Sequence, residues 1–287
     1  MIIVLILSAC GGGKKEIIIS GKPWTEQYIL PHLIGLVIEE NTDYHVKYNE
    51  GLGEVAILTP AIDKAEIDIY VEYTGTGLMD VLEEEIISGE SSEDVLERVK
   101  TGYEEKFDVT WLEPLGFENT YTLAYSADSG IDVNTYSELA EYSTSNDVVF
   151  GGPHSFYERV GDGYDDLVKE YPFDFADTKD LDPNIMYDAV ANGEVDVIPG
   201  FTTDSRIDLF DLKTTEDDKG FFPKYDAAPL VRQELLEELP ELEDAINELA
   251  GQISDEDMLK MNARVDVDEE KPEDVARDFL VEKGLIK

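Results

Sequence analysis

An aromatic ring and two hydroxyls follow a predicted strand in the segment EIDIYVEYTGTGLM, residues 66–79. Apolar and acidic residues alternate as far as Tyr73, which favours a strand, and Gly75 and Gly77 then indicate a turn. In folds that alternate strands with helices, ligands collect at the carboxyl ends of the strands. We therefore expect Tyr73 and Thr76 to lie at a ligand site.

A second segment repeats this pattern later in the chain. ANGEVDVIPGFTTD, residues 191–204, resembles DKAEIDIYVEYTGT, residues 63–76. Each copy has a helix end, an acidic strand start, an aromatic residue and threonines. The repeat places Tyr73 and Phe201 at equivalent strand ends, so two lobes that carry one copy each could turn these rings toward each other.

Catalytic and metal chemistry have little support in the sequence. There is no Gly-x-Ser-x-Gly segment and no phosphate-binding loop. The histidines, His32, His45 and His154, lack the spacing of metal ligands. We expect no cofactor, no metal and no enzymatic activity. A carboxylate-dependent hydrolase stays open as an alternative, because acidic pairs occur throughout the chain, and so does an adhesion module without a small-molecule pocket.

Charge and composition narrow the class of protein further. The 287 residues are 42% apolar, enough for a large core, and 22 basic against 66 acidic residues give a net charge of -44. This balance argues against nucleic acid as a partner, because phosphates need a cationic surface. Like charges repel less when salt screens them, so we infer a salt-rich environment.

The amino-terminal segment MIIVLILSACGGGKK resembles the lipobox of bacterial lipoproteins, in which a signal segment is cut before a cysteine that becomes lipidated. Residues 1–15 are therefore interpreted as a signal remnant and tether, with Cys10 as the lipidation site. The apolar run is too short to span a bilayer. A buried amino-terminal strand is the alternative. The lipobox interpretation predicts a protein anchored outside the cytoplasmic membrane.

Strands and helices alternate after this segment. A strand is expected at residues 16–20 and a helix at residues 25–40, which either begins near Leu30 or is kinked at Pro31. Near the carboxyl end, Ser254 and Asp257 form a helix-capping pattern, and Pro272 and Gly284 bracket the last helix. The alternation predicts an α/β fold with largely parallel sheets.

The same pattern predicts two lobes. Residues 16–118 and 219–287 form a discontinuous first lobe, and residues 119–218 form a second lobe inserted into it. The chain then crosses twice between the lobes, and two crossings make a hinge.

Five segments in order resemble the osmoprotectant-binding proteins of ABC importers, which capture glycine betaine, choline, carnitine and related compounds. The segments are GKPWTEQYIL, EIDIYVEYTGTGL, WLEPLGFENTYTLAYS, NGEVDVIPGFTTDSRI and FFPKYDAAPLVR. The resemblance covers residues 16–287. It implies a monomeric type II clamshell that closes over its ligand and delivers it to a membrane permease.

The resemblance also implies an aromatic cage for a quaternary ammonium group. A trimethylammonium group has no proton to donate, but its diffuse positive charge is attracted to ring faces. The cage positions of the family match Tyr73, Tyr121, Phe201 and Tyr225. The family commonly has tyrosine where this chain has Phe201, so a hydroxyl contact is lost there while the ring face remains.

The carboxylate positions of the family match Lys22, Thr76 and Arg159. A cationic pair favours a ligand that carries a carboxylate, with glycine betaine first and choline or carnitine as alternatives. In so acidic a protein Lys22 and Arg159 could instead be held in salt bridges. Asn119 is expected to order the loop beneath Tyr121 without touching the ligand.

Overall fold

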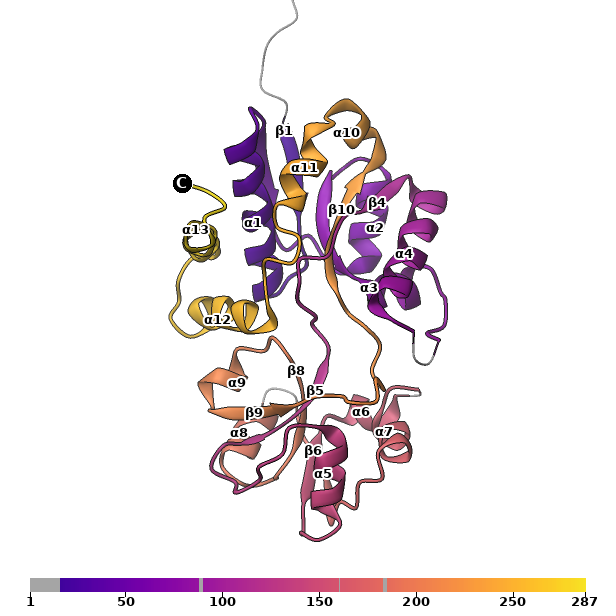
Figure 1. The fold of residues 1–287 in the computed structure, drawn as a ribbon, viewed down its shortest axis with the longest axis vertical. Coiled ribbons are helices and arrows are strands. Elements are labelled where there is room, and N and C mark those ends of the chain that lie inside the picture. Colours follow the sequence, from indigo (N-terminus) through magenta and orange to yellow (C-terminus); the bar gives the residue numbers. More distant parts are fainter. Residues whose placement is uncertain (1–15, 88–89, 160, 183–184) are drawn as a thin grey trace, which may run out of the picture.

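The computed structural model describes residues 16–287 except 88–89, 160 and 183–184. The predicted tether and Cys10 lie outside the described residues. Two groups of helices and strands are joined by two crossing segments, one before β5 and one before β10 (Figure 1). The α/β class and the two-lobe arrangement are therefore confirmed. No helix in the described part of the chain combines the length and apolar character needed to cross a bilayer.

The first lobe is built on a five-stranded sheet in the order β2-β1-β3-β10-β4. Its strands are β1 (Glu16–Ser20), β2 (His45–Asn49), β3 (Ile69–Tyr73), β4 (Val109–Trp111) and β10 (Ala227–Arg232). β1 pairs in parallel with β2 and β3, whereas β10 runs antiparallel to β3 and β4. Both faces of β3 are buried, so its one acidic residue, Glu72, is buried as well.

Helices cover both faces of this sheet (Figure 1). The elements are α1 (Thr25–Asn41), α2 (Val55–Asp63), α3 (Thr74–Thr76), the π-helical turn η1 (Gly77–Val81), α4 (Ser92–Phe107), α10 (Gln233–Glu238), α11 (Glu241–Asn247), α12 (Asp255–Asp266) and α13 (Pro272–Lys283). α1 packs with α11, α12 and α13 on one face, while α2 and α4 pack on the other. The predicted cap at Ser254 and the bracketing of α13 by Pro272 and Gly284 are confirmed.

Helix α1 passes through Pro31 without ending, so a start near Leu30 is wrong. Proline has no N–H, which leaves the carbonyl of Gln27 without its usual helical partner. Gly21 lies against this carbonyl, and a Cβ at Gly21 would be only 2.3 Å from the Gln27 oxygen. The glycine therefore allows the end of β1 to approach the start of α1 closely.

The second lobe contains a three-stranded sheet, β8-β5-β9, and a two-stranded sheet, β6-β7. The strands are β5 (Tyr121–Ser126), β6 (Val149–Gly152), β7 (Asp177–Asp180), β8 (Ile198–Phe201) and β9 (Leu212–Thr215), and the helices are α5 (Tyr136–Ser143), α6 (His154–Glu158), α7 (Tyr164–Glu170), α8 (Met186–Ala191) and α9 (Arg206–Leu209). β5 is antiparallel to both of its neighbours. The expectation of largely parallel sheets is wrong here and at β10, because β5 and β10 enter directly from the lobe crossings and need no helical crossover.

Each lobe has its own apolar core. Phe222 is buried, and with Phe221 it packs in the second lobe's core. Both residues lie just beyond the predicted boundary at residue 218. That boundary stays a prediction, but these contacts favour placing it a few residues later.

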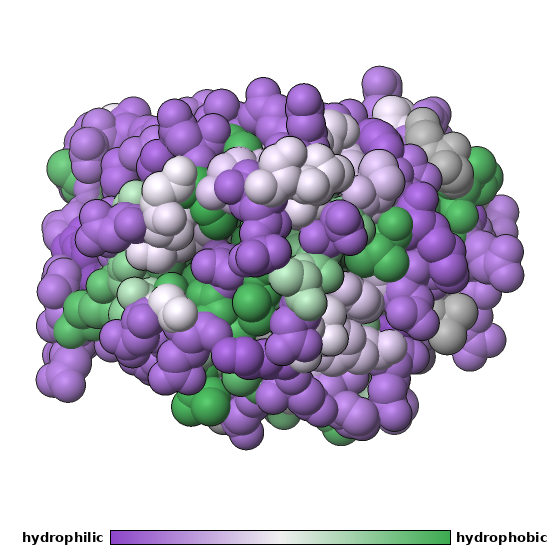
Figure 2. Space-filling model, turned by 90° about the horizontal axis from the view of Figure 1, so that it is seen from below, coloured by the Kyte–Doolittle hydropathy of each residue, from purple (hydrophilic) through white to green (hydrophobic). Residues whose placement is uncertain are grey.

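Hydrophilic residues cover most of the far end of the second lobe, with hydrophobic residues in a band across the middle (Figure 2).

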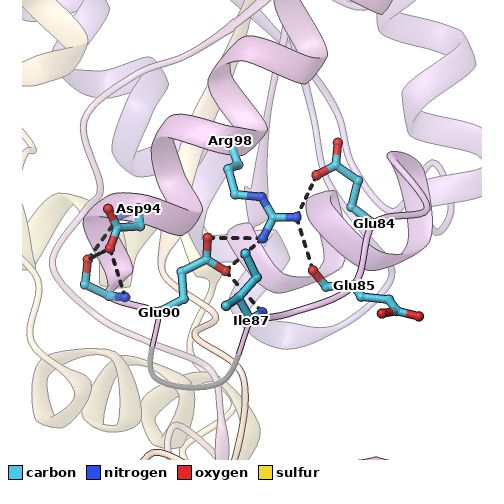
Figure 3. Close-up of polar contacts among 7 residues, drawn as sticks. Glu84, Glu85, Ile87, Glu90, Asp94 and Arg98 are labelled. Carbon is cyan, nitrogen blue, oxygen red and sulfur yellow. Dashed lines mark hydrogen bonds and ion pairs between the residues drawn. The ribbon is translucent and has the colours of Figure 1, made fainter.

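In the first lobe, Arg98 of α4 binds the segment that precedes its own helix (Figure 3). Its guanidinium donates to Glu90 at 2.8 Å, to Glu84 at 2.6 Å and to the carbonyl of Glu85 at 3.1 Å. One arginine thus offsets part of the acidic charge at this corner.

Candidate functional site

A cavity of about 900 Å³ lies between the lobes. The seven residues predicted from the sequence to contact the ligand, and Asn119, predicted to support them, all line it: Lys22, Tyr73, Thr76, Asn119, Tyr121, Arg159, Phe201 and Tyr225. They come from the turn after β1, from β3 and α3, from both lobe crossings and from the second lobe. No histidine of the described chain is among the lining residues. The tertiary fold therefore brings together groups that are up to about two hundred positions apart.

The second lobe supplies one aromatic wall. Tyr121 and Phe201 are opposite each other in the antiparallel β5–β8 pair, which places both rings at the same edge of the sheet. Their centroids are 4.7 Å apart with planes at 34°. Phe222 stacks on Tyr121 at 5.0 Å and supports this ring. Phe201 keeps 39% of its surface exposed, so its ring face is available to a ligand.

The first lobe supplies the facing wall. Tyr73 ends β3 and is buried, and Trp24 lies nearly parallel to it with centroids 6.5 Å apart. Tyr225 lies two residues before β10, whose first residue pairs with Tyr73. A Cβ at Gly75 would be 2.8 Å from the Tyr225 ring and from a backbone carbonyl. The glycine of the EYTGT turn is thus required by the close approach of a cage ring.

Lys22 does not present a free ammonium group to the cavity. Its Nζ is buried in an ion pair with Glu72, whose side chain is fully buried on β3. The same Nζ lies 5.1 Å from the Tyr73 ring centroid and 5.3 Å from that of Trp24. Burial raises the pKa of Glu72, and the Lys22 charge opposes this shift. The charge of Lys22, which was predicted to bind the ligand's carboxylate, is therefore already neutralised by Glu72.

Arg159 is paired as well. Its Nε donates to Asp162 at 2.9 Å, and its Nη2 bonds the other oxygen of the same carboxylate. The guanidinium carbon lies 5.5 Å from the Tyr121 ring centroid. Within the described part of the chain Nη1 has no hydrogen bond, so two N–H groups remain for a ligand. The salt-bridge alternative holds for both cations, but Arg159 retains donor capacity.

The hydroxyl of Thr76 is hydrogen-bonded to no other described residue, and Thr76 lines the cavity at the end of α3. Asn119, expected only to order a loop, also lines the cavity and donates to Glu26 at 3.1 Å. Thr76 thus offers a ligand a free hydroxyl, whereas the amide of Asn119 is engaged.

Glu26, in the first turn of α1, is a lining residue that the sequence did not reveal. Its carboxylate is 2% exposed and accepts hydrogen bonds from the Tyr73 hydroxyl, from Asn119 and, at 3.2 Å, from Asn262. Burial raises the pKa of Glu26, and these hydrogen bonds oppose the shift. Among 66 acidic residues, nothing local distinguished this one, although it lies inside the GKPWTEQYIL segment.

Two further contacts join the lobes along one side of the cavity. Asp266, at the end of α12, accepts from the hydroxyls of Thr25 and Ser205, which belong to different lobes. Asn262, one turn earlier, donates to the Thr203 carbonyl of the second lobe at 2.9 Å. We call these two contacts the α12 clasp. It joins the two lobes along one edge of the cleft.

Comparison with known proteins gives the family. The family described as the substrate binding domain of the ABC-type glycine betaine transport system matches residues 15–282. The chain belongs to this family. The resemblance inferred from the five segments is therefore confirmed.

Individual members of the family differ in their named ligands. The carnitine transport binding protein OpuCC of Listeria monocytogenes is 36% identical over 96% of this chain and 91% of its own length. A glycine-betaine-binding protein of Pseudomonas aeruginosa is 32% identical over 98% and 92%. The ergothioneine transport permease/binding protein EgtU of Helicobacter pylori is 34% identical over 95% of this chain, which spans 48% of that relative.

Among solved structures, a glycine betaine/carnitine/choline ABC transporter protein superposes with a TM-score of 0.88 at 32% identity, over 96% of this chain and 100% of that one. Apo YehZ of Escherichia coli superposes with a TM-score of 0.84 at 25% identity, over 94% and 99%. The chain is thus a substrate-binding protein of a glycine betaine/carnitine-type ABC importer. Which solute it carries is a separate question.

Proposed function

We propose that this substrate-binding protein captures a quaternary ammonium osmoprotectant, glycine betaine first, in the cleft between its lobes. The observation that carries the proposal is the facing pair of aromatic walls, Tyr73 and Tyr225 from one lobe and Tyr121 and Phe201 from the other, around one cavity. Ring faces attract a cation that cannot donate hydrogen bonds, with about 2 kcal/mol or less for each desolvated contact. A ligand that touches both walls favours the closed form.

Arg159 and Thr76 are assigned to the ligand carboxylate. Arg159 keeps Nη1 for a ligand, and the Thr76 hydroxyl has no competing partner among the described residues. Lys22 is assigned a smaller part than its position in the family pattern suggests, because Glu72 neutralises its charge. A half-exposed arginine and a hydroxyl suit a zwitterion such as glycine betaine better than an uncharged alcohol end.

Calorimetry with a panel of solutes tests this assignment. Glycine betaine, carnitine, choline and ergothioneine are titrated into the protein in high salt, together with proline as a solute without a trimethylammonium group. Binding of one or more trimethylammonium solutes, lost by at least about tenfold in Tyr225→Ala, is expected. Tyr28→Ala, which removes a ring that does not line the cavity, is the matched control. A protein that binds none of the four solutes contradicts the proposal.

The same proposal excludes turnover and places the protein outside the membrane. Incubation with choline esters should give stoichiometric capture and no hydrolysis, whereas release of acid at a steady rate would support the hydrolase alternative. Delivery is to an ABC permease, from a monomer tethered through lipidated Cys10. Labelling of the cellular protein with a radioactive fatty acid, lost in Cys10→Ser, is the measurement that checks the tether.

A further inference from the structure

We propose that Glu26 makes the cleft select a cation over an uncharged group of the same shape, because its carboxylate supplies negative charge at the cavity wall, bonded to the Tyr73 hydroxyl. This inference rests on the proposed function, since it assumes that a trimethylammonium group occupies the cage. It assigns a specificity-determining role to a residue outside the aromatic cage and outside the carboxylate positions.

The contacts of Glu26 suit an ionised carboxylate. The Tyr73 hydroxyl and the Asn119 amide both donate to Oε1, and the Asn262 amide donates to Oε2. The two amide nitrogens can only donate, and an ionised carboxylate can only accept. If Glu26 were protonated, its own O–H would point at groups that can only donate, and at least one of these hydrogen bonds would be lost.

The charge on Glu26 has no counterion inside the described protein. No lysine, arginine or histidine of the described chain forms an ion pair with it, and the nearby Lys22 is engaged with Glu72. A buried anion without a counterion is costly, and a positive ligand in the same cavity offsets that cost. A ligand with an uncharged group of the same shape in place of the trimethylammonium group leaves the cost in place. The negative charge of Glu26 therefore has no counterion until a cation enters the cleft.

Tyr73 carries the effect to the face of the cage. A phenol that donates to a carboxylate shifts electron density toward its oxygen and its ring, which makes the ring face more negative. The Tyr73 ring is one wall of the cavity, so this polarisation acts where the proposed trimethylammonium group would lie. Glu26 therefore acts on a cation both through space and through Tyr73.

The test compares glycine betaine with tert-butylacetate, in which a carbon replaces the charged nitrogen and the shape is kept. Affinities for wild type and Glu26→Gln are measured by calorimetry, with the weaker ligand read by displacement of the stronger. The variant should bind glycine betaine at least about tenfold more weakly and should bind tert-butylacetate, which is an anion, no more weakly than wild type does. Equal losses for both ligands, or no loss for either, overturn the proposal.

Asn262→Ala is the matched control, because it removes a brace of Glu26 and of the second lobe without removing charge. It should weaken both ligands alike. If Glu26→Gln does not fold, Tyr73→Phe keeps the ring and detaches it from the carboxylate. It should weaken glycine betaine by about threefold or more and leave tert-butylacetate unchanged; parallel losses there also overturn the proposal.

The wild type separates this inference from the proposed function. If wild type binds glycine betaine and Glu26→Gln keeps the same selectivity for glycine betaine over tert-butylacetate, only the role of Glu26 is refuted. Failure of wild type to bind any trimethylammonium solute sinks the proposed function and this inference with it.

Discussion

Replacing Lys22 with methionine should destabilise the empty protein rather than only weaken ligand binding. The lysine side chain is 3% exposed and its partner Glu72 is 0% exposed, so the variant leaves a buried carboxylate without its counterion. Removal of one partner of such a pair costs about 3–5 kcal/mol, because the remaining charge is neither paired nor solvated. A purely ligand-binding lysine would show no such loss of stability.

Proton uptake by Glu72 sets the size of this loss and makes it depend on pH. The variant can protonate the orphaned carboxylate at a cost of about 1.36 kcal/mol for each pH unit above the usual glutamate pKa near 4.3, hence about 3.7 kcal/mol at pH 7 and about 1 kcal/mol at pH 5. The folded variant then binds a proton that the unfolded chain has released, so its stability falls as pH rises between these values.

Thermal unfolding of the unliganded protein at both pH values measures the effect. At roughly 2 °C for each kcal/mol in a chain of this size, Lys22→Met should lower the melting temperature by about 7 °C at pH 7 and about 2 °C at pH 5, relative to wild type at the same pH. A deficit that is absent at pH 7, or equal at both pH values, refutes the buried-pair reasoning.

Two controls sharpen this measurement. Glu72→Gln in the Lys22→Met background removes the orphaned charge and should recover most of the stability. Lys47→Met breaks an exposed pair with Glu16, at 3.8 Å and with both side chains more than half exposed, and should change the melting temperature little.

Other consequences of the structure can be checked in the same assays. Arg159→Ala should weaken glycine betaine by about tenfold and choline by less than about twofold, a modest effect because the guanidinium is partly exposed and shared with Asp162; equal calorimetric losses would mean that Arg159 only braces its lobe. Asp266→Ala should open the α12 clasp, raise the radius of gyration of the empty protein in X-ray scattering and weaken glycine betaine severalfold; unchanged scattering and affinity would contradict this role. The melting temperature should rise between about 0.1 M and 2 M sodium chloride, because salt screens the surplus negative charge, and a flat or falling profile would argue against it.

Local sequence patterns fixed the elements that carry the cage. Alternating residues and a glycine turn predicted the strand end at Tyr73, and the repeat of this pattern predicted an equivalent end at Phe201. These signals are readable because strand periodicity and turn chemistry depend on neighbouring residues. The caps at Ser254 and Gly284 were predictable for the same reason.

The directions of the strands within the sheets could not be predicted as well from the sequence. A strand followed by a helix usually returns in parallel, but β5 and β10 arrive from the other lobe, and the direction of arrival depends on how the lobes are joined. The start of α1 was also hard to predict, because Pro31 lies inside the helix. Gly21, ten residues earlier, has no side chain and so leaves room for the Gln27 carbonyl that Pro31 deprives of its helical donor.

Only the tertiary structure decided what each charge does. Lys22 meets Glu72 across fifty positions, and Glu26 meets Asn119 and Asn262 across 93 and 236 positions. With 66 acidic residues in the chain, the sequence offers every cation many possible partners and does not say which carboxylates are buried. Burial decides the outcome, because an ion pair that is weak in water becomes strong, and an unpaired charge costly, once solvent is excluded.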